Sequence, residues 1–246
     1  MTATETPSTY EGEALGDRVR TSLELVSTAT ITTQLLDRGL RSAYLLGPKR
    51  LNPRQPQLVG EAFTLRYIPA REDLDVLSVY SDYDHPQRRA IERAPSGSVL
   101  VIDARGRAEA ASLGHILATR FAARGGAGIV TDGSVRDLAG FERLDLPTFA
   151  AGASPTTNLA QHHAADLQVP IGCGEVAVYP GDVIVGDADG VVCIPRHLAE
   201  DVARDGVEQE RLEEFVLAKI EQGQPLRGTY PPDGATRAEY EAQREA

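Results

Sequence analysis

The sequence predicts a single α/β domain built on a mixed β-sheet. Before residue 153, apolar strand-like runs alternate with helical periods, which is the pattern of βαβ units. Between 169 and 195 the pattern changes to short β-rich runs separated by the turns YPGD and GDADG, which is typical of a hairpin meander. The chain has 246 residues, 41% of them hydrophobic, so it can bury a core, although length alone does not separate one large domain from two small ones.

The elements of the first half follow from periodicity and from their boundary residues. Helices are expected where Ser/Thr capping candidates precede an apolar period and glycine ends it. Strands are expected where apolar residues alternate, or where a continuous apolar run ends in an acid and a glycine. These rules predict a helix over 23–39, strands over 58–70 and 96–106, a helix from 113 to the glycine pair 125–126, and a strand over 128–132.

The second half adds shorter elements and one long helix. The rules predict a helix over 138–145, a strand over 146–152, a helical setting for 162–163, the meander over 169–195 and an amphipathic helix from 197 to the glycine at 223. We therefore expect a flexible lead-in over 1–20, the folded domain over 21–223 and a polar surface tail over 224–246.

Composition excludes several classes of protein. A formal net charge of −11 without a basic cluster argues against a nucleic-acid partner. No apolar run approaches the roughly 18 residues of a membrane span, and the polar start of the chain lacks the apolar segment of a secretory signal. A cytoplasmic location is the default. Cys173 and Cys193 stand in apolar contexts, so we expect two buried thiols rather than a disulfide.

The segment TDGSVRD, residues 131–137, places Arg136 beside Asp137 directly after an apolar run. An adjacent pair of opposite charges is often a solvated surface ion pair, which contributes less than about 1 kcal/mol. The same pair can also form a site in which one residue holds an anion and the other a cation.

Residues 114–137, GHILATRFAARGGAGIVTDGSVRD, together with VYPGDVIVGDADGVVCIP at 178–195, resemble the RraA-like family. That family contains the regulator of ribonuclease activity A and the class II metal-dependent pyruvate aldolases, such as 4-hydroxy-4-methyl-2-oxoglutarate/4-carboxy-4-hydroxy-2-oxoadipate aldolase. The resemblance covers 21–223 and implies an α/β/α swivelling-domain-like fold, a homotrimer or hexamer, and an active site between neighbouring subunits. The aldolases carry Arg-Asp where the non-enzymatic regulators lack the acid, and Asp137 is present here.

The resemblance assigns chemistry to this motif. A divalent cation, Mg²⁺ or Mn²⁺, would stabilise the enolate of a 2-oxo acid, and Asp137 is a chemically sufficient protein ligand for it. Arg136 would pair with the substrate carboxylate and the enolate charge. Gly114 lets the backbone approach a ligand, and the N–H groups of Ile116 and Leu117 at a helix start would bind a carboxylate.

Two positions depart from the aldolase pattern. His115 and Thr33 stand where aldolases carry acids. His115 is a candidate general acid or base near neutral pH, with a structural role at the helix start as the alternative. The long C-terminal helix is expected to supply a carboxylate to a neighbouring subunit's site, with Glu213 first and Glu210 second, although such a run is normally a solvated helix face.

Other polar residues are assigned more ordinary roles. For His162 and His163 we expect a packing role rather than metal binding. The alternative is that they line the substrate cleft together with Asn158. Turn-shaping is expected for three acids, Asp103, Asp132 and Asp182.

The function predicted from these residues is a divalent-metal-dependent lyase that cleaves a 2-oxo acid to pyruvate, with oxaloacetate decarboxylation as a side activity. A dehydratase of a 2-keto-3-deoxy sugar acid, which uses the same enolate, is the second hypothesis. A non-catalytic regulator of the ribonuclease-inhibitor type is the third.

Overall fold

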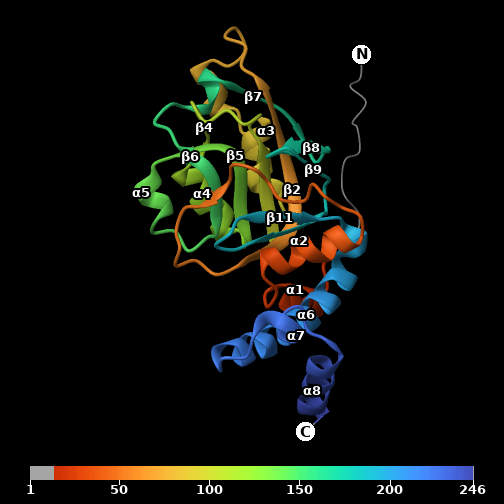
Figure 1. The fold of residues 1–246 in the computed structure, drawn as a ribbon. Helices are drawn as coiled ribbons and strands as arrows, with labels where there is room; N and C mark the ends of the chain where they lie inside the picture. The colour runs from red at the N-terminus through yellow and green to blue at the C-terminus, as the bar shows by residue number, and fades with distance from the viewer. Residues whose placement is uncertain (1–13, 246) are drawn as a thin grey trace.

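The computed structural model describes residues 14–245 and shows a mixed sheet flanked by helices (Figure 1). The main sheet has nine strands in the order β1-β6-β5-β3-β2-β10-β11, with β4 paired to β5 and β7 paired to β2. Its strands are β1 (Lys49–Arg50), β2 (Leu58–Pro69), β3 (Ser98–Asp103), β4 (Ala111–Gly114), β5 (Gly128–Arg136), β6 (Thr148–Ala153), β7 (His162–Leu167), β10 (Val183–Gly186) and β11 (Val191–Ile194). Strands β8 (Ile171–Cys173) and β9 (Val176–Val178) form a separate pair. The predicted α/β class with a mixed sheet is confirmed.

The helices pack on the sheet in two groups. Helices α1 and α2 contact α6. Helices α3 and α4 contact each other, and α3 also packs on β2 and β7 while α4 packs on β4 and β5. The helices are α1 (Asp17–Leu23), α2 (Thr28–Asp37), α3 (Pro86–Arg93), α4 (His115–Ala123), α5 (Leu138–Phe141), α6 (Ala199–Glu221), α7 (Leu226–Thr229) and α8 (Gly234–Glu245), with 3-10 turns η1 (Leu77–Ser81), η2 (Asn158–Ala160) and η3 (Arg196–Leu198). The predicted long C-terminal helix is confirmed as α6.

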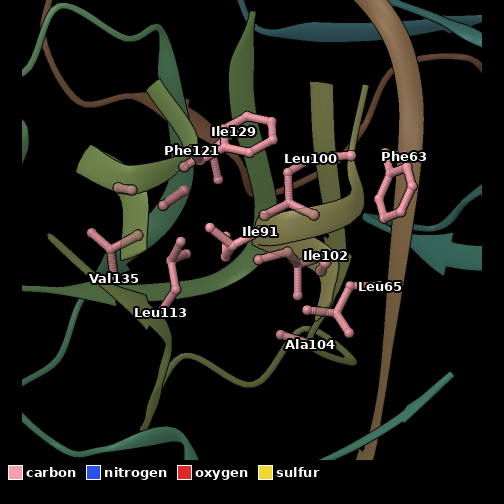
Figure 2. Close-up of a cluster of buried hydrophobic side chains, with 14 of the residues drawn as sticks. Phe63, Leu65, Ile91, Leu100, Ile102, Ala104, Leu113, Phe121, Ile129 and Val135 are labelled. Atoms are coloured by element: carbon pink, nitrogen blue, oxygen red, sulfur yellow. The ribbon is translucent and has the colours of Figure 1, made fainter. Parts of the chain in front are cut away.

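Strand alternation divides the core between the two faces of the sheet. Leu100 and Ile102 of β3 point toward α3 and α4, where they meet Ile91 and Phe121 (Figure 2). The intervening residues of β3 instead pack with β8, β9 and β10. Because β3 is buried on both faces, its sequence is a continuous apolar run rather than an alternating one.

The N-terminal segment differs from the predicted helix over 23–39. Helix α1 ends at Leu23, and α2 begins at Thr28 after Ser27, whose hydroxyl accepts a hydrogen bond from the Thr30 backbone N–H at 3.1 Å. A Ser cap between two apolar stretches thus starts a second helix instead of continuing the first. The predicted boundary between the lead-in and the folded domain, at residue 20, lies inside α1. Residues 1–13 of the predicted lead-in lie outside the described residues.

The setting predicted for 162–163 is wrong, because these residues lie on strand β7 and not on a helix. Strand β7 pairs antiparallel with the far half of β2, so a long-range partner decides its conformation. His162 is fully buried and stacks on Tyr67, with ring centroids 5.2 Å apart. His163 points to the other face, where its Nδ1 lies 2.9 Å from Asp75 Oδ1. His162 packs in the core, as predicted, whereas His163 is partly exposed and pairs with Asp75.

Several smaller expectations are also settled. Both cysteines are free and buried, and burial raises the pKa of each thiol. The described part of the tail, 224–245, forms α7 and α8, and the Tyr240 ring of α8 lies 5.6 Å from the Phe215 ring of α6. Asp132 accepts backbone hydrogen bonds from Ala104 and Gly106, as a turn-shaping acid does. Asp103 and Asp182 accept similar backbone bonds. Among the described residues, no helix has the length and apolar character that crossing a membrane requires.

Candidate functional site

One cavity of about 290 Å³ contains most of the residues that the motif singled out. We call its first side the Arg–Asp wall, which is formed by Gly114, Ile116, Leu117, Arg136 and Asp137. We call its second side the α3 wall, which is formed by Tyr80, Gln87, Arg88 and Asn158. Two apolar residues of β4, Ala111 and Leu113, complete the lining.

Strand pairing assembles the Arg–Asp wall. Strands β4 and β5 run parallel, and Gly114 is the register partner of Arg136. The end of β5 and the start of α4 therefore lie side by side, although 21 residues separate them in the sequence. The predicted strand over 128–132 extends to Arg136 because β4 and β6 pair with this extra length.

The Arg–Asp pair is exposed to the cavity. Asp137 adopts a left-handed backbone conformation, with φ 66° and ψ 45°, which short polar side chains tolerate better than others do. Arg136 Nε lies 3.6 Å from Asp137 Oδ2, and the two side chains are 43% and 54% exposed. An ion pair this long and this exposed is weak. Separating this ion pair so that each residue can bind a ligand instead therefore costs little free energy.

Gly114 leaves the space in which these two side chains lie. A Cβ at this position would be 3.0 Å from Asp137 Oδ2 and 3.2 Å from Arg136 Nε. The backbone of Gly114 is ordinary extended chain, with φ −107° and ψ 169°. The glycine is therefore needed for space and not for an unusual φ.

Helix α4 begins at the cavity without a side-chain cap among residues 14–245. The N–H groups of its first turn, including those of Ile116 and Leu117, have no acceptor one turn back in the helix. The positive end of the helix dipole adds to them, so this helix start favours an anion. Ile116 is 81% exposed and lies at the rim.

The structure does not bring His115 to the cavity. Its ring lies over Gly140, where a Cβ would approach the ring to 2.4 Å, and edge-on to Phe141 with centroids 6.1 Å apart. Nε2 is 3.1 Å from Thr119 Oγ1. The catalytic role predicted for His115 requires the ring to leave this packing, so the geometry favours the structural alternative.

The remaining predicted residues lie on the helices around α6. Glu213 accepts a hydrogen bond from Gln209 Nε2 at 2.8 Å, and Glu210 accepts one from the Ser27 backbone N–H at 2.8 Å. Thr33 lies on α2 and donates to the Ala29 carbonyl at 3.2 Å. None of these three residues lines the cavity of its own chain.

Sequence reasoning missed most of the α3 wall. Tyr80 lies on η1, and Gln87 and Arg88 lie on α3, in a stretch to which no element or role was assigned. The proline at N1 of α3, followed by QRRAIER with its apolar residues on one face, is the signal that predicts this helix. No sequence pattern predicts that α3 and Asn158 lie in the same cavity. The sequence indicates Asn158 only as an alternative residue of the substrate cleft.

Asp137 is the one carboxylate among the lining residues, and residues 14–245 contain no group of three or more His, Cys, Asp or Glu side chains placed to hold a metal ion. A site that needs three or more protein ligands, such as a zinc site, therefore does not fit this cavity. Mg²⁺ and Mn²⁺ fit it, because they prefer oxygen ligands and because Mg²⁺ keeps several waters and binds through one or two carboxylates. The weakly paired and exposed Asp137 meets that requirement.

Comparison with known proteins places the chain. The family model described as RraA-like, Aldolase/RraA, matches residues 28–193. A protein of Halalkalibacterium halodurans named "Putative 4-hydroxy-4-methyl-2-oxoglutarate aldolase" is 37% identical over 150 residues, which are 59% of this chain and 63% of the relative. The chain spans between 26% and 63% of the length of the first curated relatives it matches.

Solved structures show the same fold. Streptomyces coelicolor RraAS2, described as an unusual member of the RNase ES inhibitor RraA protein family, superposes with a TM-score of 0.73 at 33% identity, over 83% of this chain and 98% of that one. An uncharacterized protein from Pseudomonas syringae pv. tomato gives a TM-score of 0.75 at 26% identity, over 89% and 100% of the two chains. The chain therefore belongs to the RraA-like family.

Proposed function

We propose that this protein is a divalent-metal-dependent lyase that cleaves a carbon–carbon bond of a 2-oxo acid and releases pyruvate. The observation that carries the proposal is the Arg–Asp wall, where one cation, one weakly paired carboxylate and an uncapped helix start line a single cavity. The relative named as an aldolase supports the same class of reaction.

Each residue of the wall has a distinct task. Asp137 would hold Mg²⁺ or Mn²⁺, and the bound ion would supply Lewis-acid polarisation of the keto oxygen. Arg136 pairs with the substrate carboxylate and with negative charge that develops on the substrate. The first-turn N–H groups of Ile116 and Leu117 donate hydrogen bonds to the substrate carboxylate. Gly114 keeps the space between them open.

We also propose that a second copy of the chain completes the site in a trimer or hexamer. The cavity of one chain holds a single acid, and the predicted Glu213 lies on α6, outside it. A helix α6 from a neighbouring copy would bring a second carboxylate to the exposed rim around Ile116. Oxaloacetate decarboxylation is the proposed side activity, because it passes through the same enolate.

The test is a screen of 2-oxo acids with Mg²⁺ and Mn²⁺, with coupled detection of pyruvate and a separate assay for dehydration products. Asp137→Asn is expected to lower turnover by on the order of 10³-fold, because it removes the metal-binding charge. Asp145→Asn, an exposed acid beyond α5 that does not line the cavity, is the matched control and should keep full activity. Thermal unfolding establishes that both variants fold.

Unchanged rate and metal dependence in Asp137→Asn contradicts the assignment. Formation of dehydration products without pyruvate would favour the dehydratase hypothesis. A wild-type protein that turns over none of the 2-oxo acids would leave the regulatory hypothesis as the better explanation.

A further inference from the structure

One segment of the cavity wall is attached to the molecule without apolar packing. Residues 71–85, which we call the strap, join β2 to α3, contain only the short turn η1, and carry Tyr80 into the cavity. None of them is among the buried apolar residues of the described range 14–245. Four apolar side chains of the strap are instead between 44% and 82% exposed, namely those of Leu74, Val76, Leu77 and Tyr83. Apolar burial therefore contributes little to the position of the strap.

The buried side chain of the strap is a carboxylate. Of residues 71–85, all of which the structure describes, only Asp75 is buried, and 1% of its side chain is exposed. Its Oδ2 accepts a hydrogen bond from the Arg71 backbone N–H at 2.7 Å, and its Oδ1 lies 2.9 Å from Nδ1 of His163 on β7. A buried carboxylate is stable only where such partners satisfy it. The contact with His163 therefore ties the strap to the sheet.

A second polar tether lies at Tyr80. Its hydroxyl group hydrogen-bonds with Thr157 Oγ1 and lies 3.2 Å from Asn158 Oδ1. Nearer to α3, the exposed Tyr83 ring is centred 5.9 Å from the Arg88 guanidinium carbon. Hydrogen bonds weaken steeply with distance and angle, so a small displacement of the strap releases the tether at Tyr80.

We propose that the strap is a gate of the cavity, and that Asp75 and His163 are positioning residues that latch it in its closed position. The strap is fixed at one end by the Ala70 N–H, which donates to the Gln161 carbonyl at 3.1 Å, and at the other by Pro86 at the start of α3. Release of the two tethers between these ends opens the cavity wall without disrupting the core. Segments with few buried apolar contacts open most easily, and lids of binding sites are drawn from them.

The thiol introduced by Ala111→Cys reports on the gate. Ala111 lines the cavity and is fully buried, and both native cysteines are buried elsewhere. The rate at which the new thiol reacts with a chromogenic disulfide reagent follows the fraction of molecules in which the strap is open. In this background, His163→Leu should raise the rate about tenfold or more, because the buried carboxylate loses its partner. His163→Asn retains a donor and should raise it less.

Two further variants control the experiment. Asp73→Asn removes an exposed carboxylate of the same strap, which pairs only with Arg71 within the strap among the described residues, and should leave the rate unchanged. Tyr80→Phe removes the second tether with almost no change of volume and should also raise the rate. This variant keeps the test decisive if His163→Leu does not fold. Hydrogen exchange should become faster in strap peptides and stay unchanged in peptides of β3.

The outcomes decide the role of the strap without any substrate, so the lyase proposal can fail alone. An unchanged thiol rate in both His163→Leu and Tyr80→Phe overturns the gate. Faster exchange in β3 to the same extent as in the strap would overturn it as well, because the variants would then act through global stability. A rate that falls as the protein concentration rises would show instead that the strap is covered by a second copy of the chain.

Discussion

The two walls of the cavity are built in different ways. The Arg–Asp wall comes from a continuous motif, and one strand pairing, between β4 and β5, closes it. The α3 wall depends on long-range tethers: Gln87 Nε2 donates to the Ser112 carbonyl at 2.7 Å and to the Tyr67 hydroxyl at 2.9 Å. A short sequence motif and one strand pairing therefore position the Arg–Asp wall, whereas the position of the α3 wall depends on packing across the fold.

Among the variants that test this comparison, the largest effect is expected from Gly114→Ala, which tests whether the Arg–Asp wall depends on space alone. The added methyl group displaces Arg136 and Asp137, and a misplacement of about 1 Å can lower turnover by roughly 10²-fold. The unfolding free energy should change by less than about 1 kcal/mol, because φ −107° suits alanine. Steady-state kinetics and urea unfolding measure the two quantities.

Gly172→Ala is the matched control, because no atom lies within 4 Å of the Cβ it would introduce. This control should retain wild-type turnover. A Gly114→Ala protein with wild-type kinetics would show that the proposed reaction does not use the observed arrangement of the two side chains.

An intermediate effect is expected from His115→Ala, which tests where the Arg–Asp wall ends. Because the ring packs on Gly140 and Phe141, its loss should lower the unfolding free energy by about 1–3 kcal/mol and change turnover by less than about tenfold. A loss of 10²-fold or more would instead support the catalytic role predicted from the sequence.

A double-mutant cycle sharpens the result for His115. Gly140→Ala alone should destabilise the protein strongly, because its methyl group would meet the His115 ring at 2.4 Å. The same change in the His115→Ala background should cost much less. Additive effects in the cycle would mean that the two residues do not contact each other in solution.

The smallest expected effect is a pH dependence of stability that comes from His162, the buried ring that stacks on Tyr67. Burial lowers the pKa of His162, so the folded state holds the ring neutral while the unfolded chain takes up a proton near pH 6.5. The stability due to this group is therefore fully present above about pH 6.5 and is lost as the pH falls below it, toward the folded pKa.

His162→Phe keeps an aromatic ring to stack on Tyr67 and removes the titration. The fall in Tm between pH 8 and pH 5.5 should be smaller in this variant than in the wild type. His197→Gln, at an exposed position, is the control and should show the wild-type fall. An identical pH dependence in all three proteins would exclude a contribution from His162.

Strands β2 and β3 and helix α6 could be predicted from the sequence, because an alternating pattern, a continuous apolar run and an amphipathic period, in that order, have clear ends. Strand β7 could not, since the sequence HHAADL lacks a strand pattern and becomes one only by pairing with β2. Helix α5 ends at Phe141, four residues short of the prediction.

The sequence by itself determined the family pattern and the residues of the Arg–Asp wall, because Arg136 and Asp137 are adjacent and Gly114 belongs to the same motif. Only the tertiary structure decided that His115 packs on α5, and that Tyr80, Arg88 and Asn158 meet in one cavity. The reason is physical: a turn is set by the local backbone, whereas a contact between residues 25 or more positions apart exists only after the sheet has paired and the helices have packed on it.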